Sequence, residues 1–141
     1  MIDVPSACVH VKSDSQIVLS EKRSSICFLN PSRKSYELVY VDGCAIKEGP
    51  RCDYLLRRVE DSLEYFVELK GCDVPHAIEQ LRASINLLRS RDSGVDRKAY
   101  VISTRGYPRT TTGIQRAVKE FGKRLSTELV FRETPYTCTL P

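Results

Sequence analysis

The stretch Tyr65-Phe-Val-Glu-Leu-Lys-Gly71 places two charged residues, Glu68 and Lys70, in an otherwise apolar run. Side chains alternate between the two faces of a strand, so Glu68 and Lys70 are expected to point to the same side. Burying charged groups costs free energy unless a partner compensates them, and a bound metal ion is one such partner. The pattern therefore indicates an interior strand that carries chemistry on one face.

The segments before this strand predict an antiparallel meander. Residues 36–41 are rich in aromatic and β-branched residues, and an Asp-Gly turn follows them. Residues 44–46 begin a second strand segment, a tight loop follows, and residues 51–56 return. A polar connection then leads into the strand of residues 63–69.

The period of the apolar residues changes after Gly71, which indicates a helix. Asp73 can cap this helix, and Pro75 suits its first turn. The apolar residues that recur at spacings of three and four are Ile78, Leu81, Ile85 and Leu88. Residues 99–102 form the next apolar segment, and a crossover through the helix makes this strand parallel to residues 63–69.

A second helix is expected at residues 114–125, after a loop at residues 104–113. Thr112 is positioned to cap it. Its apolar stripe consists of Ala117, Val118, Phe121 and Leu125. Residues 129–131 are a last strand, and the tail from Pro135 is expected to be irregular.

The first part of the chain is compatible with more than one structure. Residues 1–15 fit a loose arm or an edge strand. Residues 16–20 and 21–29 fit a strand followed by a short helix, or one irregular helix. Residues 30–34 are turn-like, because proline and small polar residues favour a loop.

Together these elements define an α/β (α+β) fold. It has a central mixed sheet with an antiparallel meander, a crossover helix to a parallel strand, and flanking helices. The length of 141 residues fits a single domain over residues 1–141, with residues 1–34 as an arm or helix.

Composition points to an ordinary globular protein. No apolar run approaches the roughly 18 residues that span a membrane, and the N-terminus lacks the pattern of a signal peptide. We therefore expect a cytoplasmic protein without membrane association. Six cysteines are present and none forms a Cys-x-x-Cys pair, so reduced thiols in a core are expected rather than disulfides. A zinc site built on Cys8 and His10 fits no common spacing.

Positive charge is concentrated between Arg97 and Arg124, where eight basic residues and one acid, Glu120, give a net charge of +7. The basic residues are Arg97, Lys98, Arg105, Arg109, Arg116, Lys119, Lys123 and Arg124. Such a stretch suits a polyanionic partner such as DNA. The alternative is a solvated helix face.

Residues 36–102 contain an acid on one strand of a hairpin, then apolar-Glu-x-Lys on the next strand, then a helix with a glutamine, then a strand. This order resembles the PD-(D/E)xK nuclease superfamily, whose restriction-endonuclease-like fold it implies. The matching residues are Asp53, Glu68, Lys70 and Gln80. The chain departs from the motif at Cys52, where the family often has proline. Glu21 and Glu37 are two candidates for the family's additional acid.

The resemblance implies a small metal-dependent DNA endonuclease in phage or bacterial DNA processing, repair or defence. Asp53 and Glu68 would hold Mg²⁺ or Mn²⁺, Lys70 would assist the attacking water, and Gln80 would orient the site. A domain of this size leaves specificity to a homodimer or a partner protein. The residues expected to contact DNA are Arg105, Arg109, Arg116, Lys119 and Lys123.

Two alternatives predict no cleavage. One is a catalytically inactive protein of the same fold that binds nucleic acid or a protein partner. The other is an unrelated small α/β interaction domain in which Glu68 and Lys70 pair on the surface. Separation of Asp53 from Glu68 would favour the second, because the ligands of one metal ion lie close together.

Overall fold

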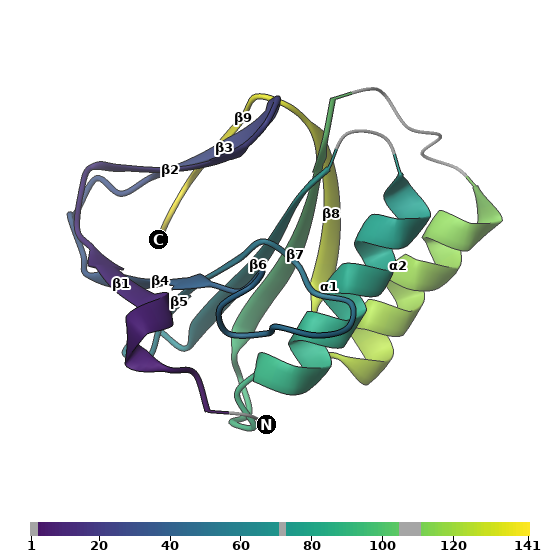
Figure 1. Ribbon diagram of the computed structural model, residues 1–141, viewed down its shortest axis with the longest axis horizontal. Coiled ribbons are helices and arrows are strands. Elements are labelled where there is room, and N and C mark those ends of the chain that lie inside the picture. The colour runs from purple at the N-terminus through teal and green to yellow at the C-terminus, as the bar shows by residue number, and fades with distance from the viewer. Residues whose placement is uncertain (1–2, 71–72, 105–110) are drawn as a thin grey trace.

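A computed structural model describes residues 3–70, 73–104 and 111–141, and for Lys70 it describes only the backbone (Figure 1). A six-stranded mixed sheet forms the middle layer. Helices α1 (Val74–Leu88) and α2 (Thr112–Arg124) cover one face, and a three-stranded sheet covers part of the other. The expected fold class is confirmed.

The six-stranded sheet has the order β1-β4-β5-β6-β7-β8. The first four neighbours, β1, β4, β5 and β6, pair antiparallel, while β7 and β8 extend the sheet in parallel. The bounds are β1 (Val9–Lys12), β4 (Tyr36–Tyr40), β5 (Tyr54–Arg58), β6 (Leu63–Lys70), β7 (Asp96–Ser103) and β8 (Glu128–Glu133). The expected meander and parallel crossover are both confirmed, and β6 lies in the interior of the sheet.

The expected helix caps are confirmed at α1 and displaced by one residue at α2. The carboxylate of Asp73 accepts a hydrogen bond from the His76 backbone N–H at 3.1 Å. At α2 the cap is Thr111, whose hydroxyl accepts from the Ile114 N–H at 3.2 Å, so the expectation for Thr112 is wrong. Helix α2 therefore begins at Thr112, before the start at Ile114 that the apolar pattern indicated.

The two faces of the large sheet have separate cores. On the helix side, Phe66 and Val101 of the sheet pack with Leu81 and Ile85 of α1 and Phe121 of α2. The bidentate ion pair between Arg82 and Glu120, at 2.8 and 2.9 Å, links the two helices. Val118 is 42% exposed, so its expected place in the apolar stripe of α2 is wrong.

The second sheet corrects the expectations for both ends of the chain. It consists of β2 (Gln16–Glu21), β3 (Ser24–Leu29) and β9 (Tyr136–Thr139), in the order β2-β3-β9. Residues 21–29 contain no helix, and the tail after Pro135 is a strand. Burial alternates with period two along β2 and β3, and their inward side chains pack on the large sheet.

Three smaller corrections concern the meander and the N-terminus. Residues 44–46 form no strand, because only an isolated bridge joins Asp42 to Ile46. The returning strand begins at Tyr54 and includes Arg57 and Arg58, which were expected in the polar connection. Residues 9–12 form an edge strand, which settles the two readings of residues 1–15 in favour of the strand.

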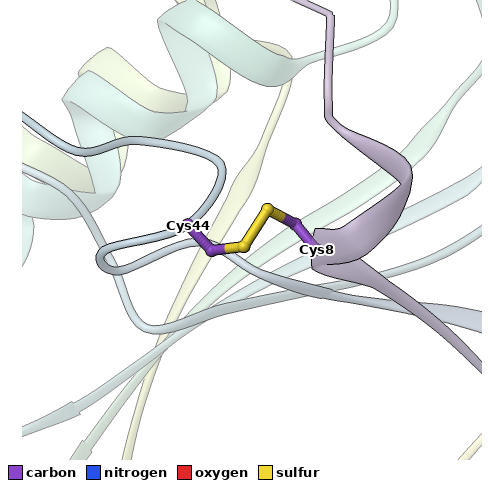
Figure 2. Close-up of a disulfide and its surroundings, with 2 residues drawn as sticks. All are labelled: Cys8 and Cys44. Atoms are coloured by element: carbon purple, nitrogen blue, oxygen red, sulfur yellow. A yellow bond between two sulfur atoms is a disulfide. The ribbon is translucent and has the colours of Figure 1, made fainter.

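A disulfide joins Cys8, at the end of the short helix η1 (Ser6–Cys8), to Cys44 in the loop after β4 (Figure 2). Their Cα atoms are 5.7 Å apart. The expectation of reduced thiols is therefore wrong for these two cysteines, and Cys8 is not a zinc ligand. Among the other described cysteines, Cys27, Cys52 and Cys138 are free thiols.

Across the part of the chain that the structure describes, neither helix is long and apolar enough to cross a membrane.

Candidate functional site

The site is built on the C-terminal half of β6. Glu68 follows Phe66 on the face that α1 covers, and its side chain is only 1% exposed. Removing a carboxylate from water in this way is expensive without compensating cations or donors.

Asp53 lies beside Glu68 across the strand pair. Residues of β5 and β6 pair as far as Tyr54 opposite Val67, Asp53 directly precedes Tyr54, and both Asp53 and Glu68 line one pocket. Two hydrogen bonds hold Asp53 there: its N–H donates to the Val67 carbonyl at 3.1 Å, and its Oδ2 accepts from the Leu69 N–H at 2.8 Å. The two acids that the sequence singled out are thus brought together.

Gln80 reaches the same region from α1. Its Nε2 donates to the backbone carbonyl of Arg51 at 3.0 Å. Because a carbonyl can only accept, this bond fixes which end of the amide is the nitrogen. The other end, Oε1, is buried and has no hydrogen-bond donor among the described residues. It is therefore positioned to accept a hydrogen bond from a bound water or ligand.

Asp53, Glu68 and Gln80 line one pocket of about 450 Å³. The pocket lies where the start of β5, the end of β6 and α1 meet. The turn between β2 and β3 supplies further lining residues, including Glu21, Lys22 and Arg23. Four carboxylates and two cationic side chains therefore share a partly open pocket, since Asp42 also lines it.

Two further acids line the pocket: Glu21, one of the two candidates for the family's additional acid, and Asp42, which the sequence analysis did not identify. Glu21 ends β2, and its Oε1 accepts from the Tyr54 hydroxyl at 3.1 Å. Asp42 accepts from the Arg51 guanidinium at 2.6 Å. Glu37, the other candidate for an additional acid, forms an ion pair with Arg57 at 2.8 Å and does not line the pocket. Both candidates lie on strands rather than on a helix.

The pKa of the Cys52 thiol is raised by its surroundings in this region. The thiol is completely buried, and burial raises the pKa of Cys52 to about 12, opposed by the Ser84 hydroxyl and reinforced by the negative charges of Glu68 and Asp53. Since a thiolate is the reactive form of cysteine, Cys52 is inert near neutral pH. The chemistry of the pocket therefore belongs to its carboxylates, its amide and its cations.

The positive residues expected at the site fall into two groups. Lys70 ends β6 opposite Ser103, and its side chain lies outside the described residues, as do Arg105 and Arg109. Arg116, Lys119 and Lys123 are exposed on α2 at helical spacings of three and four.

Arg97 does not belong to this basic surface. Its guanidinium is buried between β6 and β7, where Nε binds the Glu64 carboxylate at 2.9 Å. Further hydrogen bonds reach the carbonyls of Ser90 and Leu125 at 3.1 Å. The +7 stretch is therefore not one surface, because Arg97 stabilises the fold.

The donor set of the pocket suits a hard divalent cation. The described residues contain no cluster of three or more His, Cys, Asp or Glu side chains that could hold a metal. Asp53 and Glu68 supply two carboxylates, and the carbonyl of Leu69 points to the same side as its N–H, toward Asp53. Mg²⁺ is commonly held by one or two carboxylates and keeps several waters, so this set is sufficient.

Comparison of the chain with protein-family models, with curated proteins and with solved structures found no match.

Proposed function

We propose that this protein is a metal-dependent DNA endonuclease of the PD-(D/E)xK type. The observation that carries the proposal is the convergence on one pocket of Asp53, which directly precedes β5, Glu68 of β6 and Gln80 of α1. These are three of the four residues matched to the motif. Their order along the chain and their elements are those the resemblance implies.

In the proposal, Asp53 and Glu68 hold Mg²⁺ or Mn²⁺ through their carboxylate oxygens, with Leu69 adding a backbone carbonyl. The ion, when bound, polarises the scissile phosphate and lowers the pKa of a bound water. Asp53 is held rigidly by its bond from Leu69, so its oxygen needs no reorganisation to bind the cation. The burial of Glu68 keeps its oxygens away from competing water.

Two further residues act on the water and on the developing charge. Gln80 accepts a hydrogen bond from the attacking water through Oε1, since Arg51 has already oriented the amide. Lys70 keeps the role expected from the sequence, which is to position that water or stabilise negative charge on the phosphate. Lys22 and Arg23 supply additional positive charge at the pocket.

The exposed face of α2 is assigned to DNA backbone contacts. Arg116, Lys119 and Lys123 share that face, and the N-terminus of α2 lies at the end of the sheet where β6 ends (Figure 1). Phosphate contacts of this kind fix the position of a duplex without reading its sequence. Specificity is left to a homodimer or a partner protein.

The test is cleavage of supercoiled plasmid, linear duplex, single-stranded and branched DNA in the presence of Mg²⁺, Mn²⁺ or EDTA. The wild type is expected to cleave only with metal, and Glu68→Ala to abolish cleavage. Glu37→Ala is the matched control, because it removes a strand glutamate outside the pocket. Retention of full activity in Glu68→Ala would overturn the proposal.

The second candidate is a nuclease-fold protein that binds nucleic acid or a protein without cleaving. The exposed basic face of α2 favours it, because such a surface binds polyanions without any metal. Salt-sensitive DNA binding that is unchanged by EDTA, with no cleavage of any substrate, would select this candidate.

A cytoplasmic location is also kept as a proposal. The Cys8–Cys44 disulfide weighs against it, because disulfides are rare in the reducing cytosol. Thiol alkylation of the protein in freshly lysed cells, followed by mass analysis, decides whether these two cysteines are bonded there.

A further inference from the structure

Three aromatic rings form a row across the large sheet, on the face opposite the helices. His10 of β1, Tyr40 of β4 and Tyr54 of β5 meet edge to face, with ring centroids 4.8 Å apart between His10 and Tyr40 and 5.3 Å between Tyr40 and Tyr54. Tyr54 is buried at one end, whereas Tyr40 is 41% exposed. Part of the Tyr40 ring is therefore accessible to a ligand, while its contacts with His10 and Tyr54 hold the ring in place.

A cleft of about 390 Å³ opens beside this row, separate from the carboxylate pocket. Tyr40 and Tyr54 line it from the large sheet, and β2, an edge strand of the small sheet, forms the opposite wall, with Ile17 and Leu19 facing the large sheet. Lys12, Asp14 and Gln16 add charged and polar groups at the same cleft. Its walls thus combine two tyrosine rings and aliphatic side chains with several charged and polar groups, so a ligand there can meet both an aromatic ring and hydrogen-bonding groups.

The cleft and the carboxylate pocket share a boundary. Tyr54 lines the cleft, and its hydroxyl donates to Glu21, which lines the carboxylate pocket together with Lys22 and Arg23. Burial raises the pKa of the Tyr54 phenol, and the hydrogen bond to Glu21 raises it further, so the hydroxyl remains a donor. A strand of nucleic acid can therefore extend from the cleft to the pocket past the two cations of the β2–β3 turn.

We propose that this cleft binds one unpaired nucleobase of the nucleic-acid strand, stacked on Tyr40, while the adjoining backbone reaches the carboxylate pocket. The proposal rests on the proposed function and names its substrate class, which is DNA with a single-stranded or unpaired segment.

Two physical arguments favour an unpaired base over other occupants. Every base presents a π-face, and stacking on an exposed aromatic side chain is a general mode of single-strand recognition. A paired base inside a duplex is already stacked on both faces, so it must leave the helix before it can meet Tyr40. Lys12 provides a cation for a flanking phosphate.

Binding of a short fluorescein-labelled single strand and of its fully paired duplex, measured by anisotropy in EDTA, tests the proposal without cleavage. Tyr40→Ala is expected to weaken single-strand binding at least about fivefold, in line with alanine substitution of stacking residues, and to leave duplex binding unchanged. Tyr40→Phe keeps the ring and is expected to bind like the wild type. Equal single-strand affinities for wild type and Tyr40→Ala would overturn the proposal.

A second pair of variants covers the case in which Tyr40→Ala does not fold. Lys12→Glu introduces a negative charge at the cleft, on the face of β1 that carries His10, and is expected to weaken single-strand binding. Val11→Glu is its control, because Val11 is 68% exposed on the opposite face of β1. Equal binding by these two variants would also contradict the proposal.

Failure of the cleft can be told apart from failure of the nuclease. If Glu68→Ala abolishes cleavage but Tyr40→Ala does not change single-strand binding, the cleft proposal is wrong and the nuclease proposal is supported. If binding depends on Tyr40 but no DNA is cleaved with any metal, the cleft stands as part of a binding protein.

Discussion

The carboxylate of Asp53 accepts a hydrogen bond from the backbone N–H of Leu69, with 2.8 Å between Oδ2 and the nitrogen. This bond ties the acid that precedes β5 to the strand that carries Glu68. An asparagine at position 53 can accept the same hydrogen bond through its amide oxygen while removing the negative charge. Asp53→Asn therefore separates the charge of this residue from its structural role.

The first prediction concerns the disulfide. The bridge closes a loop across a sequence separation of 36 residues, and loop-closure entropy for that length corresponds to about 3 to 4 kcal/mol. We expect Cys44→Ser to lower the free energy of unfolding by about this amount in urea titrations without reductant. With reductant present, wild type and variant should unfold at similar urea concentrations. A wild type that is insensitive to reductant would contradict the prediction.

The second prediction concerns the buried ion pair of Arg97 and Glu64, whose side chains are 4% and 9% exposed. Arg97→Ala leaves the Glu64 carboxylate buried without its cation, which costs about 3 to 5 kcal/mol. Arg116→Ala, at an exposed site on α2, is the control and should change stability by less than about 0.5 kcal/mol. Urea denaturation of both variants checks the prediction, which fails if their losses are equal.

The third prediction is a loss of stability at alkaline pH caused by Cys52. Its pKa is 9.0 for a free thiol and about 12 in the fold, so between these values only the unfolded state loses the proton. The free energy of unfolding should therefore fall as pH rises above 9, by about 2 kcal/mol from this group at pH 10.5. The pKa values of the buried tyrosines are raised as well, so these residues add to the loss of stability at alkaline pH.

Cys52→Ala isolates the contribution of the thiol. Urea titrations at pH 8 and pH 10.5 should show a smaller loss of stability between the two values in the variant than in the wild type. Identical losses would mean that the Cys52 thiol does not contribute.

The fourth prediction tests the DNA-binding role of α2. Each phosphate contact contributes about 0.9 to the slope of log affinity against log salt for duplex DNA. Replacing Arg116, Lys119 and Lys123 together by glutamine should reduce that slope by about 2 to 3. Arg33→Gln, an exposed arginine in the loop between β3 and β4, should leave the slope unchanged. Equal slopes for all three proteins would assign DNA binding to another surface.

Much of the large sheet could be predicted from the sequence, because its signals are local. The apolar residues around Glu68 mark β6 as interior, and Asp73 with the following apolar repeat identifies α1. The proximity of Asp53 to Glu68 could be expected too, since a hairpin strand and the next strand are neighbours in an antiparallel meander.

The second sheet depends on contacts that local patterns do not contain. Ile17 and Leu19 alternate with exposed residues, but so short a run fits a strand or an irregular helix equally well. β9 is a strand because its backbone pairs with β3, more than a hundred residues earlier in the chain. The pocket position of Glu21 follows from this packing, so the sequence alone could not choose between Glu21 and Glu37.

The disulfide was missed for a similar reason. Six cysteines allow 15 complete pairings, and only the approach of η1 to the loop after β4 selects Cys8 and Cys44.

The most direct test of the central claim is calorimetric titration of Mg²⁺ and Mn²⁺ into the wild type, Asp53→Asn and Glu68→Gln, with urea denaturation to verify that each is folded. Both variants remove one negative charge and keep a side chain of similar size. We predict that the wild type binds the metal ions and that each variant loses at least about tenfold in affinity. Metal binding of equal strength in all three proteins, or no binding by the folded wild type, would contradict a metal site at Asp53 and Glu68.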